Sequence, residues 1–114
     1  MEKKNKRKAA ALVEVVAAAN QVKLAHYATL LNLYPGNSAD MQRTRLHLAL
    51  QHAPITTYEA RKYLDIYHPN ARKHELVKLG LRIDTLRIAQ QTDAGTIHHG
   101  IGLYVLQTGR ADDE

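Results

Sequence analysis

The chain has 114 residues, enough for one small domain, and 45% of them are hydrophobic, so a single core can form. It contains no cysteine, which excludes disulfides, thiolate metal sites and cysteine nucleophiles, and which fits a reducing cytoplasm. Lys and Arg outnumber Asp and Glu by 16 to 11, and the net charge of +5 favours a polyanionic partner. No apolar run approaches the roughly 18 residues that cross a bilayer, so we expect no membrane partner.

Most of the net charge lies in the first eight residues, where five Lys and Arg outweigh one Glu for a net of +4. Residues 9–37 carry no net charge, and residues 38–114 carry ten basic and nine acidic side chains. We expect residues 1–8 to form a disordered basic tail that can lie on phosphate. We also expect residues 108–114 to form a frayed acidic C-terminus.

Residues 9–33 are predicted to form one helix, because alanine is abundant there and no Gly or Pro occurs before the turn at residues 35–38. Glu14 and Asn20 interrupt the apolar stretch and no clear small-residue cleavage site follows it, which favours a helix over a signal peptide. An apolar stripe recurs at steps of three and four: Val13, Val16, Asn20, Leu24, Tyr27 and Leu31.

This stripe has two interpretations. It can pack on its own domain, or it can pack on a second copy of the chain with Asn20 as a polar register residue. A strict heptad on this stripe would put Lys23 in the seam, which weakens the coiled-coil version. For the second interpretation, four residues are the candidate dimerisation contacts: Val13, Val16, Leu24 and Leu31.

A second helix is predicted from Ser38 or Asp40 to residue 52, because both residues are good N-caps. Its buried face is supplied by four residues: Met41, Leu46, Ala49 and Leu50. Thr56 and Glu59 fit a capping box, which predicts a short helix through about residue 64.

A third helix of this group is predicted over residues 70–79. Pro69 suits its first position, where the missing N–H does no harm, and Gly80 suits a left-handed C-cap. We expect Ala71, Leu76 and Leu79 to lie on its inner side.

After Gly80 the apolar period changes from 3.6 to about 2, which is typical of strands. Apolar residues change parity between positions 83 and 86, so the pattern predicts a bulge or a bend near residues 84–85. A turn at residues 93–95 and regular alternation over residues 101–106 complete a predicted β-hairpin over 82–106 with a long tip.

The predicted order of helix, short capped helix, tight turn, helix, glycine and hairpin is that of a helix-turn-helix followed by a wing. The chain resembles the short winged helix-turn-helix domains common in phage and prophage proteins, over residues 46–106. The resemblance is carried by these pieces: Ala-Pro-Ile-Thr-Thr-Tyr-Glu-Ala at 53–60, Ala71 and Arg72, Leu76, Leu79 and Gly80 with Ile83 and Thr85, and Tyr104 to Leu106. Lys73 and Val77 depart from the family pattern, which has an aliphatic residue and an arginine there.

The resemblance implies a mainly α fold with a small β-hairpin: a winged helix-turn-helix domain at residues 38–107, preceded by a long N-terminal helix. It also implies binding of double-stranded DNA. In such units the second helix of the motif lies in the major groove and the hairpin contacts flanking phosphates or a minor groove.

A helical wheel supports this assignment independently of the resemblance. One face of the helix at residues 69–79 holds Asn70, Lys73, His74, Val77 and Lys78. Such a face can donate to base edges and neutralise phosphates, or it can be an ordinary solvated surface. Val77 is unusual there, and it fits a thymine methyl contact or a protein partner.

Further candidate DNA contacts flank this helix: Arg61 and Lys62 on the short helix, Arg82 on the first wing strand, and Gln91 and His98 toward the wing tip. Arg43, Arg45 and Arg87 are basic groups that could add to them. Taken alone, each of these basic residues fits a surface charge or a salt-bridge partner better than a DNA contact. For Arg72, near the inner face, we expect a structural ion pair with Glu75, Asp65 or Glu59.

Metal binding and catalysis have little support. The seven histidines lack ligand spacing, since His47 and His52 are five residues apart and His98 and His99 are adjacent in a strand. The sequence lacks a glycine-rich phosphate loop and an acid pair, so we expect no metal, no cofactor and no enzymatic activity.

The sequence therefore predicts a small cytoplasmic transcriptional regulator of phage, prophage or plasmid type that binds specific DNA as a homodimer. The alternative is a winged helix that binds a protein, as an adaptor or antirepressor. The near-neutral body, Val77 and the apolar N-terminal helix favour that alternative.

Overall fold

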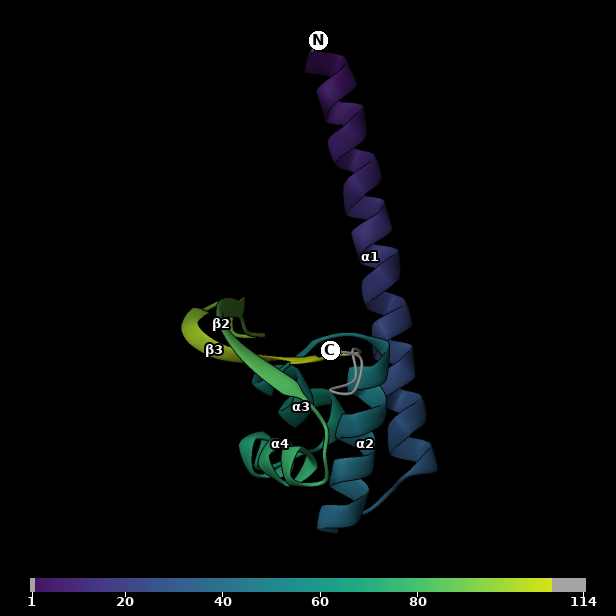
Figure 1. Cartoon of the computed structure of the whole chain (residues 1–114). Coiled ribbons are helices and arrows are strands. Elements are labelled where there is room, and N and C mark those ends of the chain that lie inside the picture. The colour runs from purple at the N-terminus through teal and green to yellow at the C-terminus, as the bar shows by residue number, and fades with distance from the viewer. Residues whose placement is uncertain (1, 108–114) are drawn as a thin grey trace.

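The computed structural model describes residues 2–107, so the predicted frayed C-terminus at residues 108–114 lies outside it (Figure 1). The described chain folds into helices and one small sheet in this order: α1 Glu2–Leu33, α2 Ala39–His52, β1 Ile55–Thr56, α3 Thr57–Leu64, α4 Pro69–Lys78, β2 Ile83–Gln91 and β3 Ile97–Leu106. The prediction of a mainly helical fold with a small hairpin, preceded by a long N-terminal helix, is confirmed. Within residues 2–107, no helix is long and apolar enough to cross a membrane.

The first helix is longer than predicted. Helix α1 begins at Glu2 rather than at residue 9, so residues 2–8, expected as a disordered tail, are helical. Lys, Arg and Glu are good helix formers, and neither Gly nor Pro interrupts the segment. The C-terminal half of α1 lies beside α2, whereas its N-terminal half projects beyond every other element (Figure 1).

The apolar stripe of α1 packs partly within its own chain. Tyr27 of the stripe and Leu30 beside it are buried in the core with 2% and 3% exposure. Leu31 is half-buried and Leu24 remains 40% exposed. The side chains of two predicted dimerisation residues, Val13 and Val16, lie outside the described part of the structure. For Tyr27 and Leu30, the interpretation of packing on the same domain is therefore confirmed.

The boundaries of the next three helices follow their predicted caps. The Ser38 hydroxyl accepts the Met41 N–H at 3.1 Å at the start of α2. At the start of α3 the capping box is complete, with both the Glu59 N–H to Thr56 Oγ1 and the Thr56 N–H to Glu59 Oε1 distances at 3.0 Å. Pro69 occupies the first turn of α4, which spans Pro69–Lys78, and Gly80 follows the helix with φ +108°.

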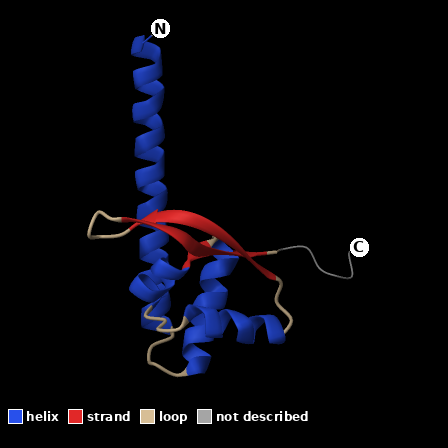
Figure 2. Ribbon diagram, turned by 90° about the vertical axis from the view of Figure 1, so that its left-hand side faces the viewer, coloured by secondary structure: helices blue, strands red, loops and turns tan. Residues whose placement is uncertain are grey.

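The sheet has a third strand that the sequence did not predict. Its order is β1-β3-β2 and both pairs are antiparallel (Figure 2). In β1, Ile55 pairs with Tyr104 and Thr56 pairs with Leu103. A strand of two residues has no period of its own, and its partner lies far along the chain, so nothing local could reveal it. Thr56 is both the last residue of β1 and the N-cap of α3.

The predicted bulge at residues 84–85 is wrong. Those residues pair regularly with β3, and the register shifts instead between Ile88 and Gln90, where Ala89 faces His99 and Gly100. Gly100 has φ +71°, a left-handed conformation that glycine adopts without steric cost. Leu86 is 52% exposed, and burial does change parity along β2, from Ile83 and Thr85 to Ile88 and Gln90, although the pairing with β3 stays regular from Ile83 to Ile88.

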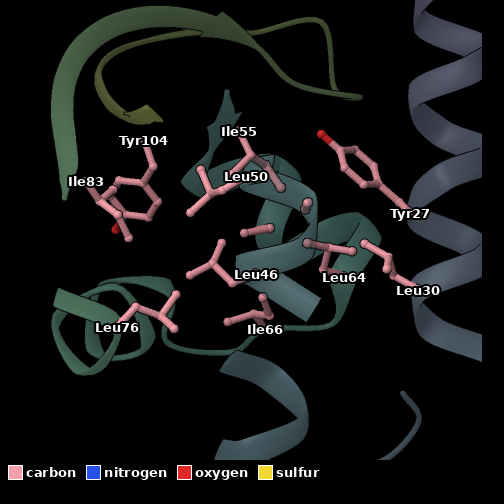
Figure 3. Close-up of a cluster of buried hydrophobic side chains, with 12 residues drawn as sticks. Tyr27, Leu30, Leu46, Leu50, Ile55, Leu64, Ile66, Leu76, Ile83 and Tyr104 are labelled. Atoms are coloured by element: carbon pink, nitrogen blue, oxygen red, sulfur yellow. The ribbon is translucent and has the colours of Figure 1, made fainter. Parts of the chain in front are cut away.

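The core lies between the helices and the inner face of the sheet (Figure 3). It joins α2 through Leu46 and Leu50 to β1 through Ile55 and to β3 through Tyr104. Leu79, predicted on the inner side, is 71% exposed, because α4 ends at Lys78 and the chain then turns at Gly80. The following residue, Leu81, packs against the core in its place.

Arg45 is fully buried on α2 and is bonded only to main-chain oxygens. Its guanidinium donates to the carbonyls of Tyr34 at 2.6 Å and Gly36 at 3.0 Å, in the turn after α1. It also donates to Leu64 at 2.8 Å and Asp65 at 3.4 Å, after α3. Burial lowers the pKa of Arg45, and the Asp65 carboxylate opposes that shift. Arg45, one of the basic groups that could have flanked a DNA site, thus joins two turns inside the fold.

Candidate nucleic-acid interface

Buried apolar residues and ion pairs on the inner side of helix α4 fix its orientation against the domain. Leu76 and Pro69 are buried, and Glu75 binds Arg43 of α2 at 3.2 Å and Arg72 of its own helix at 2.8 Å. The predicted pairing of Arg72 with Glu75 is confirmed. The opposite side of α4 therefore faces outward, with Lys73 half-buried and four residues exposed: Asn70, His74, Val77 and Lys78.

A concave surface lies between α3, the N-terminal half of α4 and the wing, and we call it the basic groove. It is lined by Thr57, Arg61, Asn70, Lys73, His74, Thr85, Arg87, Gly100, Ile101, Gly102 and Tyr104. These residues include three permanent cations and a histidine but no carboxylate. Four predicted site residues, Arg61, Asn70, Lys73 and His74, therefore line one groove together.

The floor of the groove depends on a glycine. A Cβ on Gly102 would lie 3.3 Å from both Arg87 Nη1 and Thr57 Cγ2, so a larger residue would crowd both side chains. Arg87 Nη1 also donates to the carbonyl of Gly100 at 3.5 Å, which holds the guanidinium along β3. Burial raises the pKa of the Tyr104 phenol in the floor, although the charges of Arg61 and Arg87 oppose that shift.

Four carboxylates of the described body that form ion pairs lie outside this groove. Ion pairs join Lys23 to Glu59 at 2.9 Å, Arg43 to Asp40, Arg72 to Glu75 and Lys62 to Asp93. By contrast, Arg61 and Lys73 have no ion-pair partner among the side chains that the structure describes. Residues 38–107 carry nine basic and six acidic side chains, and three of the cations line this groove.

Lys62, a predicted DNA contact, is engaged elsewhere. Its ammonium binds the Asp93 carboxylate at the wing tip and lies 5.1 Å from the centre of the Tyr63 ring. Tyr58 accepts the Asp93 N–H at 3.1 Å, so two residues of α3 bind the tip. The hydrogen bond with Asp93 raises the pKa of Lys62, and the same bond lowers the pKa of Asp93. This ion pair ties the wing to α3.

The remaining predicted residues lie outside the basic groove. Val77 and Lys78 lie farther along α4, and Arg82 lies immediately before β2 rather than within it. Gln91 and His98 are near the wing tip, where the Gln91 amide donates to the Gly95 carbonyl at 3.2 Å. No three His, Asp or Glu side chains of the described chain form a cluster able to hold a metal ion.

The sequence did not place the wing side of the groove. Arg87 appeared only as one of several basic groups, and Thr57, Thr85 and Gly102 were not named as candidate DNA contacts. Thr85 and Arg87 have the same parity on β2, and this alternation is the signal that could have placed them together. Gly102 could not be found this way, because its role depends on side chains from β2 and α3.

The sequence of residues 41–109 matches the family described as the winged helix-turn-helix domain. Neither the curated proteins nor the solved structures include a match to the chain. The matched region covers more than half of the chain and contains the three helices and the hairpin that such a domain requires. The chain therefore belongs to the winged helix-turn-helix domain family.

Proposed function

We propose that this protein binds double-stranded DNA, with α4 in the major groove and the basic groove against a phosphate backbone. The observation that carries the proposal is the gathering of Arg61, Lys73 and Arg87 around the exposed side of α4, without a carboxylate among the groove residues. Cations placed this way release counterions when they meet phosphate, which is the main sequence-independent source of affinity.

The DNA contacts in this proposal divide into two roles, one for the side chains of α4 and one for the arginines beside it. Asn70 can pair with an adenine edge, Lys73 and His74 can donate to guanine or phosphate, and Val77 can contact a thymine methyl. Lys78 extends this surface toward the C-terminal end of α4. These contacts read sequence, whereas Arg61 and Arg87 set the position of the domain on the backbone.

The wing supplies the flanking contacts. Arg82, Gln91 and His98 are exposed along or beside the hairpin and can contact phosphates next to the site. Lys62 contributes less than the sequence suggested, because Asp93 already neutralises its charge.

We further propose that the protein is a small transcriptional regulator of phage, prophage or plasmid type. The support is its resemblance to the short winged helix-turn-helix domains common in phage and prophage proteins. Occupancy of a DNA site by α4 is the mechanism.

The test is fluorescence anisotropy of a labelled random duplex across a salt series. The logarithm of the affinity should fall linearly with the logarithm of the salt concentration, and Arg61→Gln or Arg87→Gln should each reduce the slope by about 0.9. Arg43→Gln is the matched control, because Arg43 is paired with Asp40 and Glu75 outside the groove and its loss should leave the slope unchanged.

Base reading needs a second measurement, on a sequence selected from a random pool. Replacing Asn70 and Lys73 together by alanine should abolish the preference for the selected sequence over random duplex. A double variant that weakens both duplexes equally would show that α4 does not read bases.

Protein binding is the second candidate, and exposed apolar groups at one end of α4 favour it. Val77 and Leu79 are 40% and 71% exposed. If the chain fails to bind any duplex at low salt, the DNA proposal is overturned and this surface becomes the candidate interface for a protein.

A further inference from the structure

Helix α1 carries an exposed stripe that differs from the one predicted from the sequence, and we call it the heptad stripe. Its residues are separated by alternating steps of three and four: Leu12, Val15, Ala19, Val22, His26, Thr29 and Leu33. Four of them are large aliphatic side chains with 60–65% exposure: Leu12, Val15, Val22 and Leu33. Strict alternation of three and four over this length is the pattern by which one helix packs along another.

The heptad stripe is separate from the side of α1 that packs on the domain. That side contains Tyr27 and Leu30 in the core, and Lys23, whose ammonium is 2.9 Å from the Glu59 carboxylate of α3. Val22, His26 and Thr29 of the heptad stripe each lie one position before a residue of the domain-facing side. One position along a helix corresponds to a rotation of about 100° around its axis, so the two sides differ by that angle. The fold therefore uses one side of α1 and leaves the N-terminal part of this second side open, from Leu12 to Val22, whereas His26 is half-buried beside His52 of α2.

The stripe continues into a groove of the domain itself. Where α1 meets α2, an apolar groove is lined by His26, Thr29, Leu30, Leu33, Tyr34, Leu48, Gln51 and His52. Three of these residues belong to the heptad stripe, and the His26 and His52 rings lie 4.5 Å apart across the junction. A helix placed on the projecting half of α1 (Figure 1) would thus continue along an existing surface between two helices.

The residues beside the stripe identify its occupant. One flank repeats alanine at Ala11, Ala18 and Ala25, and these small side chains allow a second helix to approach closely. Between residues 9 and 33 the only Asp, Glu, Lys or Arg residues are Glu14 and Lys23, and Lys23 is already paired. Along residues 9–33 a partner selected by flanking charges finds no complement, because the basic side chains of residues 2–8 precede the stripe, whereas an identical helix brings the same spacing and the same uncharged flank.

We propose that the heptad stripe is the contact between two copies of this chain, which pair through the projecting half of α1. This contact does not depend on DNA binding. It also differs from the pairing through Val13, Val16, Leu24 and Leu31, because Leu24 lies on a different side of α1 and Leu31 is half-buried in its own domain.

The first test is the molar mass of the full chain, measured by sedimentation equilibrium. The unaltered chain should show twice 12.8 kDa, and Val15→Glu with Val22→Glu should reduce it to 12.8 kDa. The matched control is Ala17→Glu with Leu24→Glu, which puts the same charges on the exposed side opposite the stripe and should leave the dimer intact. A monomeric wild-type chain, or a dimer lost only in the control, would overturn the proposal.

A variant that strengthens the contact makes the test independent of any loss of folding. Ala19→Leu fills a position in the middle of the heptad stripe and should tighten the dimer at least tenfold, whereas Ala17→Leu should not. Equal effects of the two substitutions would contradict the assignment of the seam. Far-UV circular dichroism of every variant checks that α1 remains helical.

Discussion

At the scale of single residues, Arg45 is a buried structural residue and forms no part of the molecular surface. Its guanidinium donates to four carbonyls from two turns that are distant in sequence. Each of those carbonyls is a terminal acceptor that a helix leaves without an internal partner or a turn leaves unpaired. Removing the side chain would leave buried acceptors without donors.

We expect Arg45→Met to lower the free energy of unfolding by at least about 3 kcal/mol, because hydrogen bonds from a charged donor are lost and buried carbonyls stay unpaired. Urea unfolding followed by circular dichroism measures this change. Arg43→Met is the control, since Arg43 makes partly exposed ion pairs and its loss should cost less than about 1 kcal/mol. Equal losses for the two variants would contradict the structural role of Arg45.

The same residue marks a limit of prediction from sequence. Ser38, Thr56, Pro69 and Gly80 could be assigned because their partners lie within one helical turn. The partners of Arg45 are main-chain oxygens with no side-chain signature, so on sequence alone it looked like one more basic group. Lys62 was misplaced for a related reason, because Asp93, its partner, comes from the wing tip.

At the scale of elements, the wing is fastened at both ends. Strand β1 pairs with β3 near its base, and Lys62 and Tyr58 of α3 bind Asp93 at its tip. Because Lys62 lowers the pKa of Asp93, the ion pair is complete above the usual pKa of an aspartate and is lost only as the pH falls through the lowered value. The wing therefore stays fastened at neutral pH.

We expect Tyr58→Phe and Asp93→Asn each to increase amide hydrogen exchange in the segment around the tip, at residues 90–97, by several-fold. The Asp93 N–H loses its acceptor in the first variant, and the Lys62 ammonium loses its counter-charge in the second. Hydrogen exchange followed by mass spectrometry resolves this segment. Asp84→Asn, at the other end of the hairpin, should leave exchange at the tip unchanged; faster exchange there would mean that the whole hairpin had loosened.

More of the fold than of the candidate site could be predicted from the sequence, because the helices and the hairpin depend on local signals. Helices α2 to α4 follow from caps and apolar spacing, and the hairpin follows from alternation, all of which are local. The bulge at Ile88 and the strand β1 are set by pairing with β3. The basic groove forms only when α3, α4 and the wing meet, so the sequence identified four of its eleven lining residues, on α3 and α4, and did not place the wing side.

At the scale of the whole molecule, positive charge occupies two separate regions. One is the basic groove, and the other is the first two turns of α1, where residues 2–8 carry a net charge of +4. The helix carries this second region to the far end of its projecting half (Figure 1). A single value of the net charge hides this separation.

Deleting residues 2–8 should therefore weaken binding to all duplexes alike and leave the preference for a selected sequence unchanged. The removed Lys and Arg side chains can contribute only through phosphate, and salt screens them beyond about 10 Å at 0.1 M. Anisotropy titrations of the selected and random duplexes measure the ratio of affinities. A deletion that lowers this ratio would mean that the N-terminal turns take part in reading sequence.

The position of Thr56 limits where residues can be inserted in this domain. The residue ends a strand and caps a helix at once, so the sheet and α3 share a joint with no spare residue between them. One inserted residue would rotate α3 by about 100° relative to the sheet and move Arg61 away from Arg87. Homologues and engineered variants should therefore keep the joint at Thr56 at a constant length.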